Sequence, residues 1–170
     1  MEDKMAIEMK YCMQCGEKLT EKMLEGEGMV PWCPSCGDFR FPIFNTAVSM
    51  IVMNESRTKI ILIKQYGRPD YILVAGYINK GEDAEDAAKR EVFEELGLHV
   101  KELHFNHSHY FAPSNTLMLN FTVTVEGKEP TPNREIDSYS WFSPEDAKAN
   151  IKRNSLAQRF LNWYLDGGEF

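Results

Sequence analysis

Residues 76–98, GYINKGEDAEDAAKREVFEELGL, decide the fold of this chain, because they join a strand ending to a helix that carries clustered acids. On a helix, Glu91 and Glu95 lie one turn apart on the same face, and Glu94 lies just beside Glu91. Arg90 precedes this group directly. The apolar side chains of the segment point to another side, so the sequence predicts a helix with a carboxylate face.

The clustering of three carboxylates has a chemical consequence. They repel one another, so a fold that keeps them together either holds a cation or raises their pKa values. Ligands that are all oxygen suit a hard ion, Mg²⁺ or Mn²⁺. The alternative is a solvated helix face on which Arg90 and Glu94 form an ordinary i,i+4 ion pair.

The complete pattern of residues 76–98 resembles the Nudix box. The matching positions are Gly76, Glu82, Arg90, Glu91, Val92, Glu94, Glu95, Gly97 and Leu98. The resemblance implies an α+β fold, namely an α/β/α sandwich around a mixed sheet. It also implies a hydrolase of phosphoric anhydride bonds, whose substrate is a nucleoside diphosphate linked to a second moiety.

Two cysteine pairs, in residues 12–16 (CMQCG) and 33–37 (CPSCG), precede this domain. Each Cys-x-x-Cys-Gly turn offers two thiolates to a tetrahedral ion, which is the pattern of a zinc ribbon. The four ligands would be Cys12, Cys15, Cys33 and Cys36. They leave no open coordination position, so we expect a structural Zn²⁺. Two disulfides, four free thiols and a rubredoxin-like iron site are the alternatives.

Composition limits the chain to one full domain plus a small appendage, because it has 170 residues, of which 43% are hydrophobic. We expect the zinc ribbon with its lead-in over residues 1–41 and the Nudix domain over residues 42–170. The charged N-terminus and the absence of an apolar run of 18 residues predict a cytoplasmic protein with no membrane segment. A net charge of −7 argues against stable nucleic-acid binding but permits a small nucleotide.

The remaining strands and helices follow from local patterns. We expect a hairpin of residues 47–53 and 59–65, strands over 71–75, 100–109, 116–125 and 137–142, and helices that begin near Asp83, Ser143 and Ser155. Gly97 is expected to end the first of these helices.

A zinc ribbon directly before a Nudix domain resembles the NADH pyrophosphatase branch of the family. That resemblance implies divalent ions on the carbonyl of Ala75 and on Glu91 and Glu95. A further ligand of the branch matches Glu135, in NREIDSYSWF, although a lone acid there would otherwise be a surface loop residue. Glu94 matches either an additional ligand or the general base.

The resemblance also implies a mechanism in which a water activated by the ions attacks one phosphorus of the diphosphate in line. Glu94 or Glu91 would take its proton. Arg90 and Glu82 would orient the metal ligands, and Gly76 opens the box. For NAD(H) the products would be AMP and nicotinamide mononucleotide. The family further implies a homodimer.

Substrate choice depends on residues 108–116, SHYFAPSNT, which correspond to the substrate motif of the branch. Ser108 is retained, Phe111 and Thr116 are conservative replacements, and the prolines are displaced. Tyr77 and Phe111 could stack on a nucleobase or pack into the core. NAD(H), ADP-ribose and nucleoside triphosphates therefore all stay open as substrates, and a non-catalytic module that senses a nucleotide or docks a partner is the rival from another class.

Overall fold

The computed structural model describes residues 8–168, which form two compact units. The smaller unit contains residues 8–45 together with Ala112–Asn115, and the larger contains Thr46–Phe111 and residues 116–168. The first seven residues of the expected lead-in lie outside the described residues. No helix within residues 8–168 is both long and apolar enough to span a membrane.

The smaller unit is built on a three-stranded antiparallel sheet, β1 (Thr20–Leu24), β2 (Gly28–Cys33) and β3 (Asp38–Phe39), in that spatial order. The rings of Trp32 and Phe39 pack edge to face with 4.8 Å between centroids. Its buried apolar residues, among those described, are Cys12, Val30 and Cys33. So small an apolar core contributes little stability by itself.

The larger unit contains a six-stranded mixed sheet. Its strands are β4 (Asn45–Met53), β5 (Ile60–Gln65), β6 (Val74–Tyr77), β7 (Val100–Phe111), β8 (Thr116–Val125) and β9 (Ile136–Phe142). The order is β7-β8-β4-β5-β9, and β6 pairs with β4. The central position of β4 explains its nearly continuous apolar sequence, because a strand covered on both faces buries every side chain.

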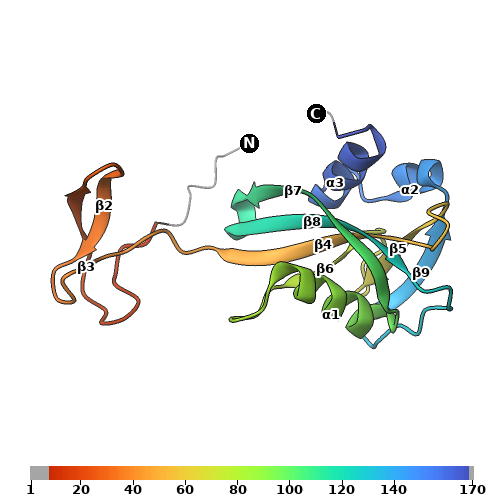
Figure 1. The fold of residues 1–170 in the computed structure, drawn as a ribbon, viewed down its shortest axis with the longest axis horizontal. Helices are drawn as coiled ribbons and strands as arrows, with labels where there is room; N and C mark the ends of the chain where they lie inside the picture. The colour runs from red at the N-terminus through yellow and green to blue at the C-terminus, as the bar shows by residue number, and fades with distance from the viewer. Residues whose placement is uncertain (1–7, 169–170) are drawn as a thin grey trace. The chain divides into compact units, whose positions relative to one another are not determined.

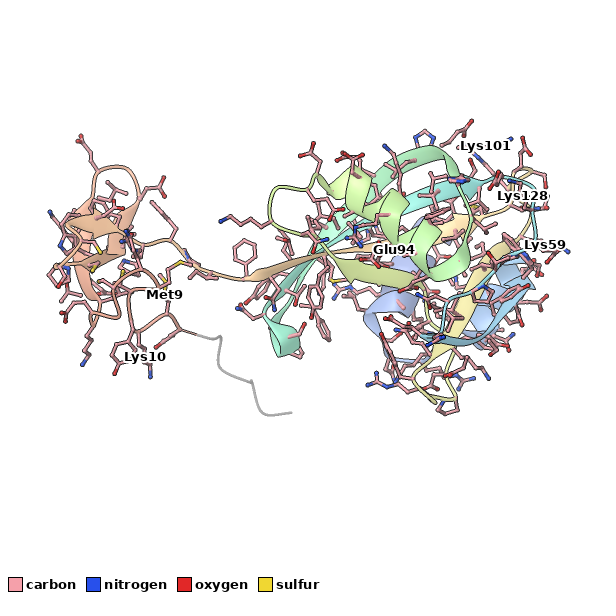
Figure 2. All side chains as sticks on the ribbon, turned by 90° about the horizontal axis from the view of Figure 1, so that it is seen from below. Met9, Lys10, Lys59, Glu94, Lys101 and Lys128 are labelled. Carbon is pink, nitrogen blue, oxygen red and sulfur yellow. The ribbon has the colours of Figure 1, made fainter. Side chains whose placement is uncertain are left out.

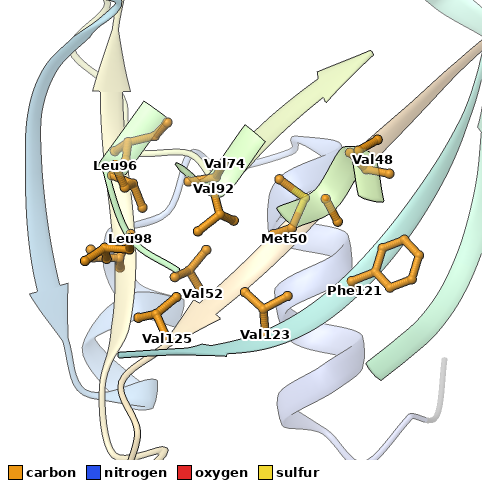
Figure 3. Close-up of a cluster of buried hydrophobic side chains, with 14 of the residues drawn as sticks. Val48, Met50, Val52, Val74, Val92, Leu96, Leu98, Phe121, Val123 and Val125 are labelled. Carbon is orange, nitrogen blue, oxygen red and sulfur yellow. The ribbon is translucent and has the colours of Figure 1, made fainter. Parts of the chain in front are cut away.

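Helices cover both faces of this sheet (Figure 1). Helix α1 (Ala84–Leu96) lies on one face, and α2 (Pro144–Asn150) and α3 (Leu156–Leu165) lie on the other. The sandwich predicted from the sequence is therefore confirmed. Successive residues of β4 point to opposite faces, so Met50 packs beneath α1 (Figure 3) and Ile51 packs beneath α2 and α3.

The ends of the helices follow the predicted residues. Gly97 ends α1 in the left-handed conformation, with φ 67°, and its N–H donates to the carbonyl of Phe93. Ser143 and Ser155 accept cap hydrogen bonds from the backbone N–H groups of Asp146 and Gln158. Asp83 holds the N-cap position of α1, but its side chain accepts no cap hydrogen bond.

Two strand predictions need correction, and one small sheet was not predicted. The strand expected over 71–75 begins at Val74 and ends at Tyr77, because residues before it make only isolated bridges, such as that of Ile72 with Ile63. Gly76 is consequently a strand residue that pairs with Val48. The strand expected over 100–109 continues to Phe111, and the short strands of the smaller unit were not predicted from the sequence.

Candidate active site

Arg90 gathers three acids of the box, Glu82, Glu91 and Glu94, around one guanidinium. Its Nε and Nη2 donate to the two carboxylate oxygens of Glu82 at 2.7 and 2.9 Å. Nη1 donates to Glu91 at 2.6 Å and to Glu94 at 3.0 Å, and Nη2 also donates to the carbonyl of Tyr77 at 3.0 Å. A planar fork is needed to reach so many acceptors at once, which an ammonium group cannot do.

Glu82 connects the loop before α1 to this fork. The backbone N–H of Asn79 donates to Glu82 Oε2 at 2.9 Å, beside the two bonds from Arg90. The Arg90 guanidinium, and then the Asn79 N–H, lower the pKa of Glu82 to about 2. Glu82 is therefore a fixed counter-charge, which suits a residue that orients Arg90 more than one that binds a proton during turnover.

Glu95 is the buried acid of the group, with 5% of its surface exposed. Burial, followed by the charges of Glu91, Glu135 and Glu94, raises the pKa of Glu95 to about 8. Its Oε2 is buried and has no hydrogen-bond partner among the described residues. Buried polar atoms in proteins are nearly always partnered, so this oxygen fits a ligand atom for a cation.

Glu135 is brought to Glu95 by backbone hydrogen bonds between the loop before β9 and the end of α1. The N–H of Thr131 donates to the carbonyl of Leu96 at 2.7 Å, and the N–H of Asn133 donates to the carbonyl of Glu95 at 3.1 Å. The side chain of Asn133 then accepts from the N–H of Glu135 at 2.9 Å. The acid beyond the box therefore faces the acids on α1.

These residues line one cavity of about 470 Å³. Its lining consists of Gln65, Tyr66, Ala75, Gly76, Tyr77, Asn79, Glu91, Glu94, Glu95, Asn133 and Glu135. The structure thus places the predicted ligands on α1, on β6 and before β9 around the same space; Glu94 marks it in Figure 2. Clustered carboxylates with a buried unpartnered oxygen fit a hard divalent ion such as Mg²⁺ or Mn²⁺.

Gly76 has a steric role in this cavity. A Cβ at this position would overlap the carboxylate of Glu91. The missing side chain allows Glu91 on α1 to lie directly against β6.

The three residues predicted to contact the substrate do not lie at the same cavity. Tyr77 lines the carboxylate cavity and is 60% exposed, so it does not pack into the core. Ser108 and Phe111 lie on β7 and do not line the carboxylate cavity. Phe111 instead lines a second cavity of about 410 Å³ beside α3. The substrate-binding role of all three residues remains a prediction.

Tyr66 also lines the carboxylate cavity, and sequence reasoning missed it. Its hydroxyl donates to Glu135 Oε2 at 2.7 Å, and this bond is the largest cause of a raised pKa of the Tyr66 phenol. The residue lies in a left-handed conformation, with φ 56°. Nothing in the sequence around Tyr66 signals either property.

The four cysteines form a second candidate metal site, in the smaller unit. Their Sγ atoms all lie within 4.8 Å of one another, and none forms a disulfide. The two knuckles face each other, with 3.9 Å between the sulfurs of Cys12 and Cys36 and 3.5 Å between those of Cys15 and Cys33. This cluster could hold a tetrahedral metal ion.

Arg40 supports the cysteine cluster and is not signalled by the Cys-x-x-Cys pattern. Its Nε donates to Cys12 Sγ at 3.2 Å, and its Nη1 donates to Asp38 at 2.7 Å. The hydrogen bond from Arg40 is the main reason that the pKa of Cys12 is lowered to about 6. Arg40 therefore favours the thiolate, the form of cysteine that binds metal.

The geometry defines a class of protein that the family comparison confirms. The NUDIX domain family matches residues 44–164, which is most of the chain, and the chain belongs to this family. Among solved structures, a NUDIX hydrolase from Nitrosomonas europaea superposes with a TM-score of 0.65 at 21% identity, over 94% of each chain. A structure titled for MutT from Aliivibrio salmonicida and Vibrio cholerae gives 0.61 at 22% identity, over 74% of this chain and 98% of that one. These likenesses establish the fold.

Curated relatives are named as hydrolases. The chain is 27% identical over 157 residues to the NAD-capped RNA hydrolase NudC of Stutzerimonas stutzeri, covering 92% of this chain and 56% of the relative. It is 30% identical over 162 residues to the protein of the same name from Haemophilus influenzae strain PittEE, covering 92% of this chain and 60% of the relative. The chain thus spans little more than half the length of these relatives.

Proposed function

We propose that this chain is a Nudix pyrophosphohydrolase, which uses divalent ions to cleave a nucleoside diphosphate linked to a second moiety. The observation that carries the proposal is the buried Glu95 carboxylate, whose Oε2 has no partner among the described residues and lies among three further acids. A module that only senses a nucleotide gains nothing from burying such an acid among others, whereas an ion site needs it.

The ions would be held by Glu91, Glu95, Glu135 and the carbonyl of Ala75, all of which line the same cavity. A divalent ion there supplies acidity to a bound water and offsets the negative charge of the diphosphate. The raised pKa of Glu95 supports this assignment, because a positive ion would remove the repulsion that keeps the acid protonated.

The division of labour among the acids follows from their exposure. The side chain of Glu94 is 53% exposed and that of Glu91 only 13%. Glu94 can therefore accept a proton from water at the cavity and pass it to solvent, so we assign it as the general base and Glu91 as a ligand. Arg90, fixed by Glu82, holds both carboxylates at one nitrogen and so sets their separation.

For the substrate we favour a dinucleotide such as NAD(H), cleaved to AMP and nicotinamide mononucleotide. Support comes from the cysteine cluster joined to a NUDIX domain and from relatives whose name includes NAD-capped RNA. Such a cap presents the same diphosphate on an RNA, although the net charge of −7 disfavours broad contact with a phosphate backbone. ADP-ribose and nucleoside triphosphates are the alternatives within the same chemistry.

A substrate panel tests this proposal. NADH, NAD⁺, ADP-ribose, ATP and NAD-capped RNA are incubated with the enzyme in Mg²⁺ and in Mn²⁺, and AMP, phosphate, pyrophosphate and the decapped 5′ end are measured. We expect AMP from NADH at the highest kcat/KM, and no product from the Glu95→Gln variant. Nucleotide binding without turnover in either ion would instead support the sensing module.

The cysteine cluster would hold a structural Zn²⁺, because four thiolates close the coordination sphere. Metal analysis of the purified protein tests this, with one zinc per chain expected; visible absorption would identify iron instead. The homodimer expected from the family is tested by sedimentation, and cytoplasmic location by cell fractionation.

A further inference from the structure

We infer that Tyr66 is a positioning residue that fixes Glu135 as a metal ligand, and that the turn carrying Tyr66 is strained to achieve this. The inference rests on the proposed function, since it takes Glu135 to hold an ion. It adds a residue that lies outside the box and outside the family pattern described above.

The backbone around Tyr66 adopts a conformation that tyrosine disfavours. The N–H of Arg68 donates to the carbonyl of Gln65 at 3.1 Å, closing a four-residue turn. Both central residues have positive φ, 56° at Tyr66 and 66° at Gly67, as in a type I′ turn. Asn, Asp or Gly normally fill the first central position, because a larger side chain with a Cβ is crowded there. Strain of this kind concentrates at functional sites.

Two hydrogen bonds hold this turn against the start of β9. The hydroxyl of Tyr66 donates to Glu135 Oε2 at 2.7 Å, and the N–H of Gly67 donates to Asp137 Oδ2 at 2.6 Å. Glu135 and Asp137 flank Ile136, which is buried. The turn is therefore hydrogen-bonded to the chain on both sides of the buried Ile136. Of the two bonds, the one from Tyr66 reaches the acid that lines the cavity.

Packing does not explain the choice of tyrosine. Its surface is 62% exposed, so the ring gains little from apolar burial. The specific contact of the side chain is the hydroxyl, and its partner is a carboxylate that lines the cavity. A strained position occupied by an exposed ring is best explained by what its hydroxyl does.

The consequence for Glu135 is a fixed orientation. One carboxylate oxygen, Oε2, accepts the hydrogen bond from Tyr66, which leaves Oε1 as the oxygen for an ion. Outer partners of this kind orient metal-binding carboxylates, and losing one typically weakens metal binding about 10- to 100-fold. Tyr66 would thus set the affinity of the ion without touching it.

The test compares Tyr66→Phe and Tyr66→Asn in the whole chain, with two readouts. Mn²⁺ affinity is titrated by electron paramagnetic resonance, and the melting temperature is measured without added Mg²⁺ or Mn²⁺. We expect both variants to bind Mn²⁺ about 10-fold more weakly or worse. Tyr66→Asn should also melt about 2–4 °C higher than Tyr66→Phe, because both variants lose the hydroxyl and only Asn accepts the left-handed conformation. Unchanged Mn²⁺ affinity in Tyr66→Phe, or a Tyr66→Asn variant that melts no higher than Tyr66→Phe, would overturn the inference.

Tyr71→Phe is the matched control. Its hydroxyl hydrogen-bonds with that of Ser140 at 3.1 Å, and neither residue lines the carboxylate cavity. It should leave Mn²⁺ affinity unchanged; an equal loss there would mean that any lost hydroxyl in this region has the effect, and would count against Tyr66.

Glu135→Gln separates this inference from the function on which it rests. If Glu135→Gln weakens Mn²⁺ binding and Tyr66→Phe does not, the inference fails while the proposed ligand set stands. If Glu135→Gln leaves Mn²⁺ binding unchanged, the ligand assignment itself fails and the inference falls with it. If both weaken binding, adding Tyr66→Phe to Glu135→Gln should cause no further loss, because the hydroxyl acts through that carboxylate.

Discussion

The carboxylate of Glu91 occupies the space that a side chain on residue 76 would need. Strand β6 and helix α1 can therefore approach closely enough for Glu91 to reach the cavity only because Gly76 has no Cβ. Residue 76 has no functional side chain, yet it should tolerate substitution as poorly as Glu91, whose carboxylate it makes room for.

Replacing Gly76 with Ala should displace Glu91 and reduce turnover by about two orders of magnitude, since small misplacements at a reacting centre cost that much. Overpacking should also lower the free energy of unfolding by about 1–3 kcal/mol. Steady-state kinetics and urea titration measure the two effects. Gly127→Ala is the control, because the nearest atom to its Cβ would be Glu55 Oε2 at an ordinary 3.8 Å. Wild-type turnover in Gly76→Ala would contradict the assignment of Glu91.

Without added Mg²⁺ or Mn²⁺, the free energy of unfolding should depend on pH through the protonation of Glu95. Because the folded-state pKa is raised from 4.5 to about 8, the folded chain holds a proton that the unfolded chain has released. Stability should fall as pH rises from about 5 to about 8 and then level off, by a few kcal/mol at most. Urea titrations at pH 6 and pH 9 measure the fall.

The Glu95→Gln variant removes the titration of Glu95 and serves as the comparison. It should show a smaller loss of stability between pH 6 and pH 9 than the wild type, and Mg²⁺ should stabilise the wild type more than the variant. An identical pH dependence in the two proteins would show that Glu95 is not protonated near neutral pH.

Arg90→Lys should preserve the charge and lose the fork. A lysine cannot reach Glu82 bidentately while also bonding Glu91 and Glu94. We expect kcat to fall by about 10- to 100-fold with little change in the melting temperature. Full activity in the lysine variant would mean that charge alone, and not the separation of the two carboxylates, matters at this position.

Removal of the proposed zinc ion should unfold only the smaller unit. Cys33→Ser deletes one proposed ligand, and Cys33 is fully buried. The two cores of the larger unit consist of other residues, so α1 and the six-stranded sheet should persist. Hydrogen exchange is the measurement, with lost protection expected in β1–β3 and retained protection in β4 and α1. Protection lost equally in both units would show that they unfold together.

The sequence predicted what depends on local spacing. Arg90, Glu91, Glu94 and Glu95 lie on one helix, so their proximity follows from 3.6 residues per turn, and the same holds for the end of α1 at Gly97. Glu135 came from the family resemblance. Its route to the cavity depends on backbone bonds to α1 that no sequence pattern encodes.

The residue roles that could not be predicted from the sequence depend on contacts between positions far apart in the chain. Tyr66 hydrogen-bonds to Glu135, which lies 69 positions further along the chain. That contact is made from a backbone conformation with positive φ, which a tyrosine in the sequence does not predict. Phe111 shows the converse: its aligned motif suggested a place at the substrate, but the cavity it lines is the one beside α3. The alternation along a strand shows which residues share a face of β7, but it does not show which other element packs against that face.

The loop before β9 is attached to α1 through the backbone N–H groups of Thr131 and Asn133, and the side chain of Thr131 plays no part in either bond. Those main-chain bonds survive most exchanges of side chain, whereas the position of Glu135 depends on the number of residues between the attachment and Glu135. The loop should therefore tolerate substitution at residue 132 and resist any change of length. A single inserted residue after Asn133 would separate Glu135 from Glu95 more thoroughly than any point mutation.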